Sequence, residues 1–428
     1  MNVLLLGSGG REHAIAWKIS QSSLLSKLYV APGNAGTETM ATNVDLDIMD
    51  FPSIGRFIRK HDIDMLIVGP EAPLVEGIID FFQDSDKFEG LVTIGPRKQG
   101  AMLEGSKDFA KEFMIKHNIP TADYATFKNE DVKAAKAFLD ERTPPYVIKA
   151  DGLAAGKGVY ICENFNHAEK GVKEIFGGKF GKADEILVED YLTGEEMSFF
   201  ILYDNETFKI FNTAQDHKRV FEGDKGNNTG GMGAYSPSRL DSNELKKKII
   251  DKIILPTLNY LKKENAKYIG FLYAGLMIKN NEPYLIEYNV RMGDPECQTI
   301  LPLLKNDLID VIENCINKNL NKIELKWKNE KSICIVVTSK GYPEEFKKNI
   351  LIDNLEKFKN TDDQYIFHAG TYLREKKFYS RGGRVLNIVA IDKNLKIARN
   401  KAIKIIKELK WKNGHYRNDI GYKVIDNL

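Results

Sequence analysis

Short apolar runs alternate with amphipathic stretches over the first hundred residues. The runs, each followed by glycine or proline, lie at residues 3–6, 28–31, 65–68 and 91–94. Strands that alternate with helices are typical of a parallel sheet. Ligands of such sheets lie beyond the carboxyl ends of the strands. We therefore expect Gly9, Asn34 and Glu71, which follow three of these runs, to meet in one crevice.

The pattern changes twice further along the chain. A helix is predicted at 106–117, followed by strands at 146–150, 158–162 and 185–189. The next part, 195–290, is rich in strands and is interrupted by a polar loop at 215–236 and a helix at about 243–263. After about residue 325 we expect strands at 332–338 and 384–391 and an amphipathic, Lys-rich helix at 394–409. The length of 428 residues suits two to four domains.

Composition narrows the class of protein. Lys and Arg total 62 against 60 Asp and Glu, so the chain has no large net positive charge that would favour binding to nucleic acid. The four cysteines show neither C-x-x-C nor metal spacing, as expected for reduced thiols in the cytoplasm. The chain enters an apolar strand at once and contains no stretch long enough to span a bilayer. We expect a cytoplasmic protein with small-molecule partners, without nucleic acid or membrane, as a monomer or small homo-oligomer.

The first glycine-rich turn, GSGGREH at 7–13, begins like a dinucleotide fingerprint. Gly7 and Gly9 fit, but Glu12 stands in the third glycine slot, and the second strand ends in PGNAGT rather than in an acid. What remains is a helix start whose N–H groups attract an anion, most naturally a phosphate. The alternative interpretation is a tight turn without a ligand.

A second glycine-rich turn, KADGLAAGKGV at 149–159, connects two predicted strands. It is not a P-loop, because the spacing fails and Gly158 stands in the Ser/Thr position. A mobile hairpin with Lys149 and Lys157 at its ends suits folding over a triphosphate. The alternative is a flexible surface hairpin.

The segment LIEYNVR at 285–291 reads as a strand with one chemically active face. Alternation places Glu287, Asn289 and Arg291 on that face, with Ile286, Tyr288 and Val290 opposite. Carboxylate and amide oxygens suit Mg²⁺, and an arginine beside them can clamp a transferring phosphoryl group. The alternative, an edge strand with a polar solvent face, leaves the following GDPE unexplained.

A third polar stretch, QDHKR at 215–219 followed by GGMG at 230–233, is a plausible anion site, although alone it is more often a solvated loop. His217 has no visible catalytic partner. We find no serine or cysteine nucleophile paired with a base, so covalent catalysis has no support.

Seven motifs in order, GSGGREH, PGNAGT, GPEAPLVEG, KADGLAAGKGV, EDYLTGEEMS, NTGGMGAYSP and IEYNVRMGDPECQ, resemble the phosphoribosylamine–glycine ligase (glycinamide ribonucleotide synthetase) family of ATP-grasp enzymes. The resemblance covers essentially the whole chain. It implies an α/β and α+β multidomain fold: an N-terminal parallel Rossmann-like domain at 1–105, a two-lobed ATP-grasp domain at 106–324 and a C-terminal mixed α/β domain at 325–428. The small lobe would span about 120–190 and the larger lobe about 191–324.

The resemblance also implies residue roles. The 5-phosphate and ribose of phosphoribosylamine would meet Gly9, Gly10, Asn34, Gly69, Pro70 and Glu71. ATP would meet Lys107, Lys149, Gly152, Gly156, Lys157, Gly158, Glu189, Tyr191 and Leu192, with Glu196 on its ribose and Glu195 as the rival. Asp216, Arg291 and Asp294 would surround glycine, and Arg291, Lys149 and Asp216 would serve catalysis. Glu287 and Asn289 would bind Mg²⁺, with Mn²⁺ as an alternative.

Two positions depart from the family pattern. Asn227 replaces a usual proline, and residues 273–277 offer no acid for a second metal. The activity implied is ADP-forming ligation of glycine to phosphoribosylamine through glycyl phosphate, in purine biosynthesis. Rival interpretations are an ATP-grasp ligase with another amine acceptor, an NAD-dependent oxidoreductase, and a silent binding module.

Overall fold

A computed structural model describes residues 1–153, 158–179, 183–264 and 266–426. Its N-terminal part is a parallel sheet in the order β5-β4-β1-β2-β3. The strands are β1 (Asn2–Gly7), β2 (Lys27–Pro32), β3 (Thr42–Asn43), β4 (Met65–Val68) and β5 (Val92–Pro96). The helices are α1 (Gly10–Ile19), α2 (Phe51–Lys60), α3 (Glu71–Val75), α4 (Ile78–Gln83) and α5 (Lys98–Gly105). The four predicted strands are confirmed.

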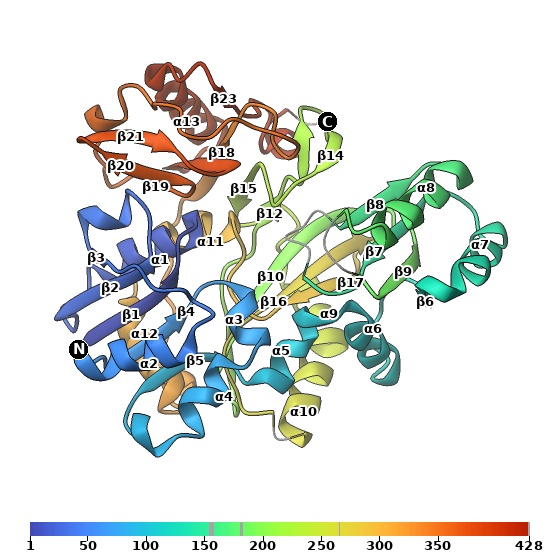
Figure 1. The fold of residues 1–428 in the computed structure, drawn as a ribbon, viewed down its shortest axis with the longest axis horizontal. Coiled ribbons are helices and arrows are strands. Elements are labelled where there is room, and N and C mark those ends of the chain that lie inside the picture. Colours follow the sequence, from blue (N-terminus) through green and yellow to red (C-terminus); the bar gives the residue numbers. More distant parts are fainter. Residues whose placement is uncertain (154–157, 180–182, 265, 427–428) are drawn as a thin grey trace.

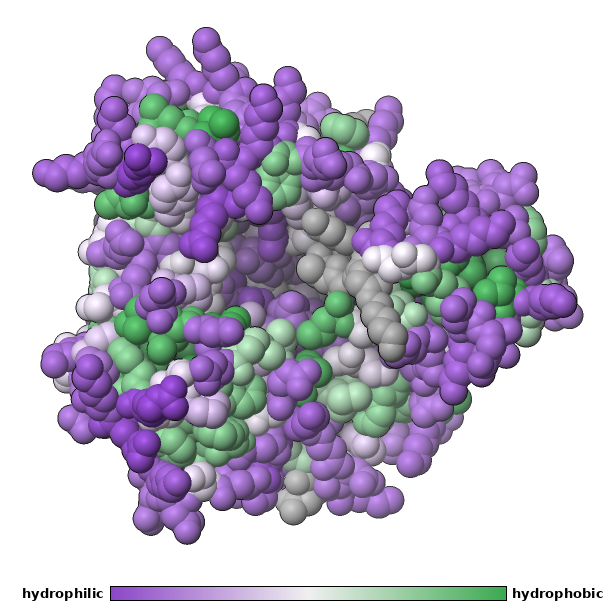
Figure 2. Space-filling model, in the orientation of Figure 1, coloured by the Kyte–Doolittle hydropathy of each residue, from purple (hydrophilic) through white to green (hydrophobic). Residues whose placement is uncertain are grey.

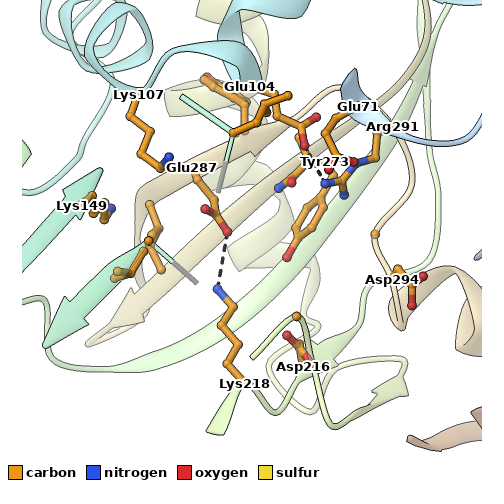
Figure 3. A pocket seen from close by; sticks show the side chains of 18 of the residues that line it. Glu71, Glu104, Lys107, Lys149, Asp216, Lys218, Tyr273, Glu287, Arg291 and Asp294 are labelled. Atoms are coloured by element: carbon orange, nitrogen blue, oxygen red, sulfur yellow. Dashed lines mark hydrogen bonds and ion pairs between the residues drawn. The ribbon is translucent and has the colours of Figure 1, made fainter. Parts of the chain in front are cut away.

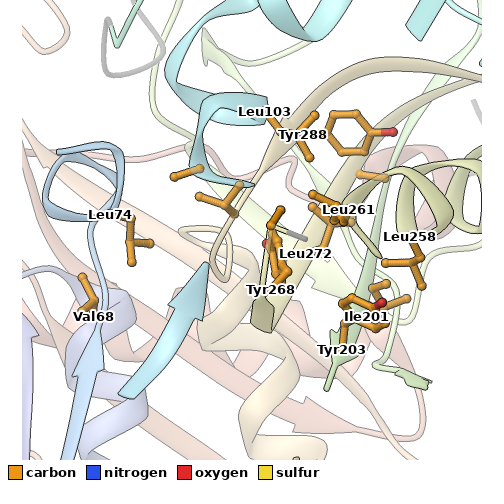
Figure 4. Packing of buried hydrophobic residues seen from close by; sticks show 14 of the residues in the cluster. Val68, Leu74, Leu103, Ile201, Tyr203, Leu258, Leu261, Tyr268, Leu272 and Tyr288 are labelled. Carbon is orange, nitrogen blue, oxygen red and sulfur yellow. The ribbon is translucent and has the colours of Figure 1, made fainter. Parts of the chain in front are cut away.

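This sheet continues into the next part of the chain, because β16 pairs antiparallel with β5. The added strands are β10 (Glu195–Tyr203), β11 (Phe208–Ile210), β16 (Tyr268–Lys279) and β17 (Glu282–Asn289). They are covered by α6 (Lys107–Lys116) and by a helix that runs as α9 (Asn243–Ile249), a π-helical turn and α10 (Leu255–Lys263). Val68 and Leu74 share one core with Leu258 and Leu272 (Figure 4), so the first two parts pack as one body.

A smaller lobe stands apart from this body at the right of Figure 1. Its four-stranded sheet has the order β6-β9-β7-β8. The elements are β6 (Tyr124–Lys128), α7 (Val132–Asp140), β7 (Tyr146–Ala150), β8 (Val159–Cys162), α8 (Phe165–Phe176) and β9 (Glu185–Asp190). The predicted glycine hairpin connects β7 to β8, and its residues 154–157 lie outside the described part of the chain.

The C-terminal sheet has the order β12-β15-β18-β22-β19, with β23 paired to β18. Its strands are β12 (Gln215–Asp216), β15 (Gly233–Ser236), β18 (Lys331–Ser339), β19 (Gln364–His368), β22 (Arg384–Asp392) and β23 (Gly414–His415). Separate ribbons are β13 (Arg219–Phe221) with β14 (Lys225–Asn228), and β20 (Thr371–Arg374) with β21 (Lys377–Ser380). The remaining helices are α11 (Glu296–Ile300), α12 (Leu308–Ile316), α13 (Leu395–Leu409) and α14 (Tyr422–Ile425).

The prediction of a plain polar loop at 215–236 is wrong, since this stretch contains β12 to β15. These short strands owe their pairing to distant residues. Ala234, for example, lies opposite Cys334 of β18, a partner that no local pattern reveals. Among the described residues, no helix has the length and apolar character needed to cross a membrane.

Candidate active site

A cavity of about 750 Å³ lies where the three parts meet, and Figure 2 shows a recess with largely hydrophilic walls there. Most of the predicted site residues line it: Gly9, Pro70, Glu71, Lys107, Lys149, Gly152, Gly158, Glu189, Tyr191, Leu192, Glu196, Asp216, Glu287, Asn289, Arg291 and Asp294. Gly10, Asn34 and Gly69 do not belong to its wall. Gly156 and Lys157 lie outside the described residues.

The start of α1 is occupied by carboxylates of the protein itself. The Gly9 N–H donates to Glu12 Oε2 at 2.7 Å, and the Arg11 N–H donates to Asp294 Oδ2 at 3.4 Å. Glu12 therefore meets the positive end of the helix that the glycine-rich turn exposes. Gly69 leaves room for it, because a Cβ there would lie 2.2 Å from Glu12 Oε1. A phosphate contact at Gly9 and Gly10 stays a prediction.

Asn34 joins loops that come from different parts of the chain. Its Nδ2 donates to the carbonyls of Ser8 and His368, each at 2.9 Å. Its Oδ1 accepts from the N–H groups of Gly36 at 2.8 Å and Thr37 at 3.1 Å. Both ends of the amide are thus engaged inside the protein, and the structure places Asn34 behind the cavity wall.

Arg291 is held between two carboxylates from the N-terminal part (Figure 3). Its Nη2 lies 2.6 Å from Glu104 Oε1, and its Nε lies 3.3 Å from Glu71 Oε2. Burial alone would raise the pKa of Glu71, but Arg291 and Arg11 lower it to about 2. Burial dominates at Glu104 and raises its pKa to about 7 despite Arg291. Sequence reasoning missed Glu104, since this residue belongs to none of the seven motifs.

Two lysines share one acid at the entrance to the small lobe. Lys149 Nζ lies 2.8 Å and Lys111 Nζ 3.2 Å from the carboxylate of Glu189. Burial would raise the pKa of Glu189, but these two ammonium groups lower it. Lys107 Nζ donates to the Gly152 carbonyl at 2.6 Å, at the base of the glycine hairpin. Lys111 was not predicted, because it lies in an ordinary helical sequence.

The strand β17 carries the predicted metal ligands on the cavity side. Gly275 of β16 pairs with Glu287 and Leu276 pairs with Leu285, so Ile286 is the extra residue of a β-bulge. The bulge breaks the strict alternation expected from the sequence, and Ile286 and Tyr288, predicted on the opposite face, also line the cavity. Among the described strands β17 pairs with β16 alone and is therefore an edge strand, but its polar face is turned to the cavity rather than to bulk solvent.

The two donors fit a divalent cation. Glu287 offers a carboxylate and Asn289 an amide oxygen, and both residues line the cavity. Among the described residues no group of three or more His, Cys, Asp or Glu side chains could hold a metal. A cation here would therefore depend on Glu287, Asn289 and oxygens from a bound substrate, which is how Mg²⁺ usually binds.

Lys218 lies beside Glu287, and sequence reasoning did not single it out from QDHKR. Its Nζ lies 3.0 Å from Glu196 Oε2. The same atom lies 3.5 Å from Glu287 Oε1, a contact drawn in Figure 3. Glu196 lines the cavity, whereas the rival Glu195 pairs with Arg239 and does not line it. Geometry therefore favours Glu196 as the ribose contact, whose role stays a prediction.

Acidic groups gather at the far end of the cavity. Burial, and next the charge of Glu296, raise the pKa of Asp216 well above its ordinary value, although Lys218 opposes them. Asp294 pairs with Arg384 of β22 at 3.4 Å. The C-terminal sheet thereby contributes a side chain to the wall, which the sequence did not indicate. The wall at this end of the cavity thus combines the acids Asp216 and Asp294 with the cation Arg384.

These features define a class of protein. A two-lobed body with a glycine hairpin, inward lysines and a Glu–Asn pair on an edge strand is an ATP-grasp ligase architecture. Residues 1–104, 105–297 and 332–423 match the N, ATP-grasp (A) and C domains of phosphoribosylglycinamide synthetase. The chain belongs to the phosphoribosylglycinamide synthetase family, and the predicted fold class and family are confirmed.

Relatives with an assigned name align with this chain over almost their full length. A phosphoribosylamine–glycine ligase of Brucella melitensis is 43% identical over 100% of this chain and 99% of its own. A relative of the same name from Mesorhizobium japonicum is 44% identical over 99% of both chains. The crystal structure of a phosphoribosylamine–glycine ligase from Thermotoga maritima has a TM-score of 0.81 at 32% identity, covering 98% of this chain and 100% of that one.

Proposed function

We propose that the protein ligates glycine to 5-phosphoribosylamine at the expense of ATP, giving glycinamide ribonucleotide, ADP and phosphate in purine biosynthesis. The observation that carries this proposal is one continuous cavity. It connects Gly9 and Glu71, at the carboxyl ends of the N-terminal strands, with Lys149 and Glu287 of the ATP-grasp part. Three substrates must meet for this reaction, and one cavity lined by residues of the N-terminal, ATP-grasp and C-terminal parts allows them to meet.

Phosphoryl transfer comes first. A carboxylate oxygen of glycine attacks the γ-phosphorus of ATP, the bond to the β,γ-bridging oxygen breaks, and ADP leaves. Lys107, Lys149 and Lys218 surround the expected path of the phosphates. Such cations neutralise the charge of the transferring group, which is the main protein contribution to phosphoryl transfer.

The ligation step follows. The amine nitrogen of phosphoribosylamine attacks the carbonyl carbon of glycyl phosphate, the C–O bond to phosphate breaks, and the nitrogen loses a proton. We assign Arg291 to the acyl phosphate, because Glu71 and Glu104 hold its guanidinium where the N-terminal part meets the ATP-grasp part. Asp216 and Asp294 are assigned to glycine, and the N-terminal turn with Pro70 and Glu71 to phosphoribosylamine.

A divalent cation at Glu287 and Asn289 would neutralise phosphate oxygens during the transfer. We propose Mg²⁺, because its preferred ligands are oxygens and it tolerates few protein donors. Mn²⁺ has the same preference for oxygen and would serve as a substitute.

The cellular setting is also a proposal. All four cysteines are buried and free, which suits the reducing cytoplasm. We propose a cytoplasmic monomer or small homo-oligomer whose functional parts divide near residues 105 and 325.

Phosphate release from ATP tests the activity. We expect sustained release only when glycine and phosphoribosylamine are both present, and little when either is omitted. Another amine that replaces phosphoribosylamine equally well would favour a ligase with a different acceptor. Release that ignores glycine would contradict the proposal.

A further inference from the structure

The segment that carries Lys218 is attached to the C-terminal part of the chain. We call residues 216–231, which include the β13–β14 ribbon, the site hairpin. Asp216, Lys218 and Thr229 of this hairpin line the cavity. Thr229 links the two sides of the site hairpin, because its N–H and its hydroxyl each donate to the Lys218 carbonyl at 2.8 Å. The position of Lys218 therefore depends on what holds the hairpin from outside.

Arg417 provides the central anchor. Its side chain is fully buried, with 0% exposed. Its Nε and Nη2 donate to Asp419 at 2.8 and 2.9 Å. Its Nη1 donates to the Arg219 carbonyl at 3.0 Å and to Asp224 at 2.9 Å. One guanidinium thus binds the residue after Lys218 and the turn of the ribbon.

Neighbours of Arg417 add further contacts. Asp419 accepts from the Gly223 N–H at 2.8 Å, and the Tyr422 hydroxyl donates to Asp224 at 3.0 Å. The Gly421 N–H donates to His217 Nε2 at 3.1 Å. Burial lowers the pKa of His217 to about 4, so this nitrogen is free to accept at neutral pH. Figure 1 shows β14 beside the end of the chain.

We propose that Arg417 is a positioning residue that fixes Lys218, and with it the charge beside Glu287, through the site hairpin. The residues on both sides of Lys218, His217 and Arg219, are bound by residues 417–421. Misplacing a group near the reacting atoms by about 1 Å can cost about 100-fold in rate. This inference rests on the proposed function.

A double-mutant cycle tests the proposal. Arg417→Met should lower kcat about tenfold or more in the wild-type background. In a Lys218→Met background, where the positioned charge is gone, the same change should lower kcat less than about twofold. Arg399→Met is the matched control, because Arg399 also binds one carboxylate through two nitrogens, that of Asp426, without touching the hairpin. It should leave kcat close to wild type.

Equal losses in both backgrounds would overturn the proposal, as would an Arg417→Met enzyme with wild-type kcat. If Arg417→Met does not fold, Tyr422→Phe tests the same clamp by removing a single hydroxyl; its loss of kcat should also depend on Lys218. Ethylguanidinium should restore part of the activity of Arg417→Ala, and failure to do so with a folded variant counts against the role.

Hydrogen exchange separates this inference from the proposed function. Amides of residues 217–230 should exchange faster in Arg417→Met than in Arg399→Met. That comparison needs no substrate, so it holds whatever the enzyme ligates. Unchanged exchange would show that the clamp does not fix the hairpin.

Discussion

Arg291 is bound by two carboxylates with opposite acid–base behaviour. Glu71 has its pKa lowered to about 2, because Arg291 and Arg11 outweigh its burial, whereas burial raises the pKa of Glu104 to about 7. Glu71 therefore stays ionised at neutral pH, whereas Glu104 takes up its proton close to neutral pH. The charge around Arg291 therefore changes near neutral pH through the protonation of Glu104.

Stability should report the titration of Glu104. A carboxyl group whose pKa is raised on folding binds more protons in the folded state, so its contribution to stability falls as pH rises from about 4.5 to about 7. Glu104→Gln keeps an uncharged side chain throughout this range. We expect the melting temperature of the wild type, relative to this variant, to fall between pH 5 and pH 8. A difference that stays constant with pH would contradict the assignment.

Glu287 should be indispensable for turnover but not for folding. The Lys218 ion pair near its carboxylate is partly exposed, so its loss should cost little stability. We expect Glu287→Gln to lower kcat about 100-fold or more, because a charged ligand facing the phosphates is lost. Glu195→Gln is the matched control, since Glu195 pairs with Arg239 away from the cavity. Turnover within about twofold of wild type in Glu287→Gln would refute the metal assignment.

At the scale of elements, α6 and β7 are tied to β9 through one buried carboxylate. Lys111 of α6 and Lys149 of β7 both bind Glu189. Without Lys111, Glu189 keeps Lys149 as its ion-pair partner, and the loss of one hydrogen bond to a charged group typically costs about 1.5–3 kcal/mol. We expect Lys111→Met to lower the melting temperature by several degrees and to raise the KM for ATP about tenfold.

The matched control for Lys111→Met is Lys136→Met. Lys136 pairs with Glu169 at the surface of the small lobe, where an ion pair is worth little. Its melting temperature and KM for ATP should stay near wild type. An unchanged KM in Lys111→Met would show that Glu189 does not orient the nucleotide side of the cavity.

Local patterns predicted the regular elements well and the irregular ones poorly. Apolar runs such as residues 65–68 became strands because they are buried on both faces. The bulge at Ile286 and the strands within 215–236 depend on partners in β16 and β18, which no local period contains. Glu12 illustrates the same limit at a site: its misfit to the glycine slot was visible, but its bond to the Gly9 N–H was not.

The candidate site was predicted through its motifs. Residues outside the seven motifs or in uninformative positions, such as Lys111, Glu104 and Arg384, entered the site only through the folded arrangement. Asn34 shows the reverse case, since a residue in a motif serves to join loops behind the wall. A motif thus indicates that a residue matters, while its contacts decide how.

At the scale of the whole molecule, the shared core and the continuous sheet join the N-terminal and ATP-grasp parts into one body. Each of these two parts contributes one wall of the cavity. We expect substitutions on these walls to affect different substrates. Glu71→Gln should raise the KM for phosphoribosylamine more than that for ATP. Tyr191→Ala, at the exit from β9, should do the opposite. Equal changes in both KM values would contradict the division of labour between the N-terminal and ATP-grasp parts.

The central claim is that glycine is activated at its carboxylate and then joined to phosphoribosylamine in this cavity. Glycine labelled with ¹⁸O in both carboxylate oxygens tests it most directly, with ATP, Mg²⁺ and phosphoribosylamine present. The account predicts glycinamide ribonucleotide and phosphate in equal amounts, with one ¹⁸O atom transferred to each phosphate. Product formed with unlabelled phosphate, or ATP cleaved without glycinamide ribonucleotide, would contradict it.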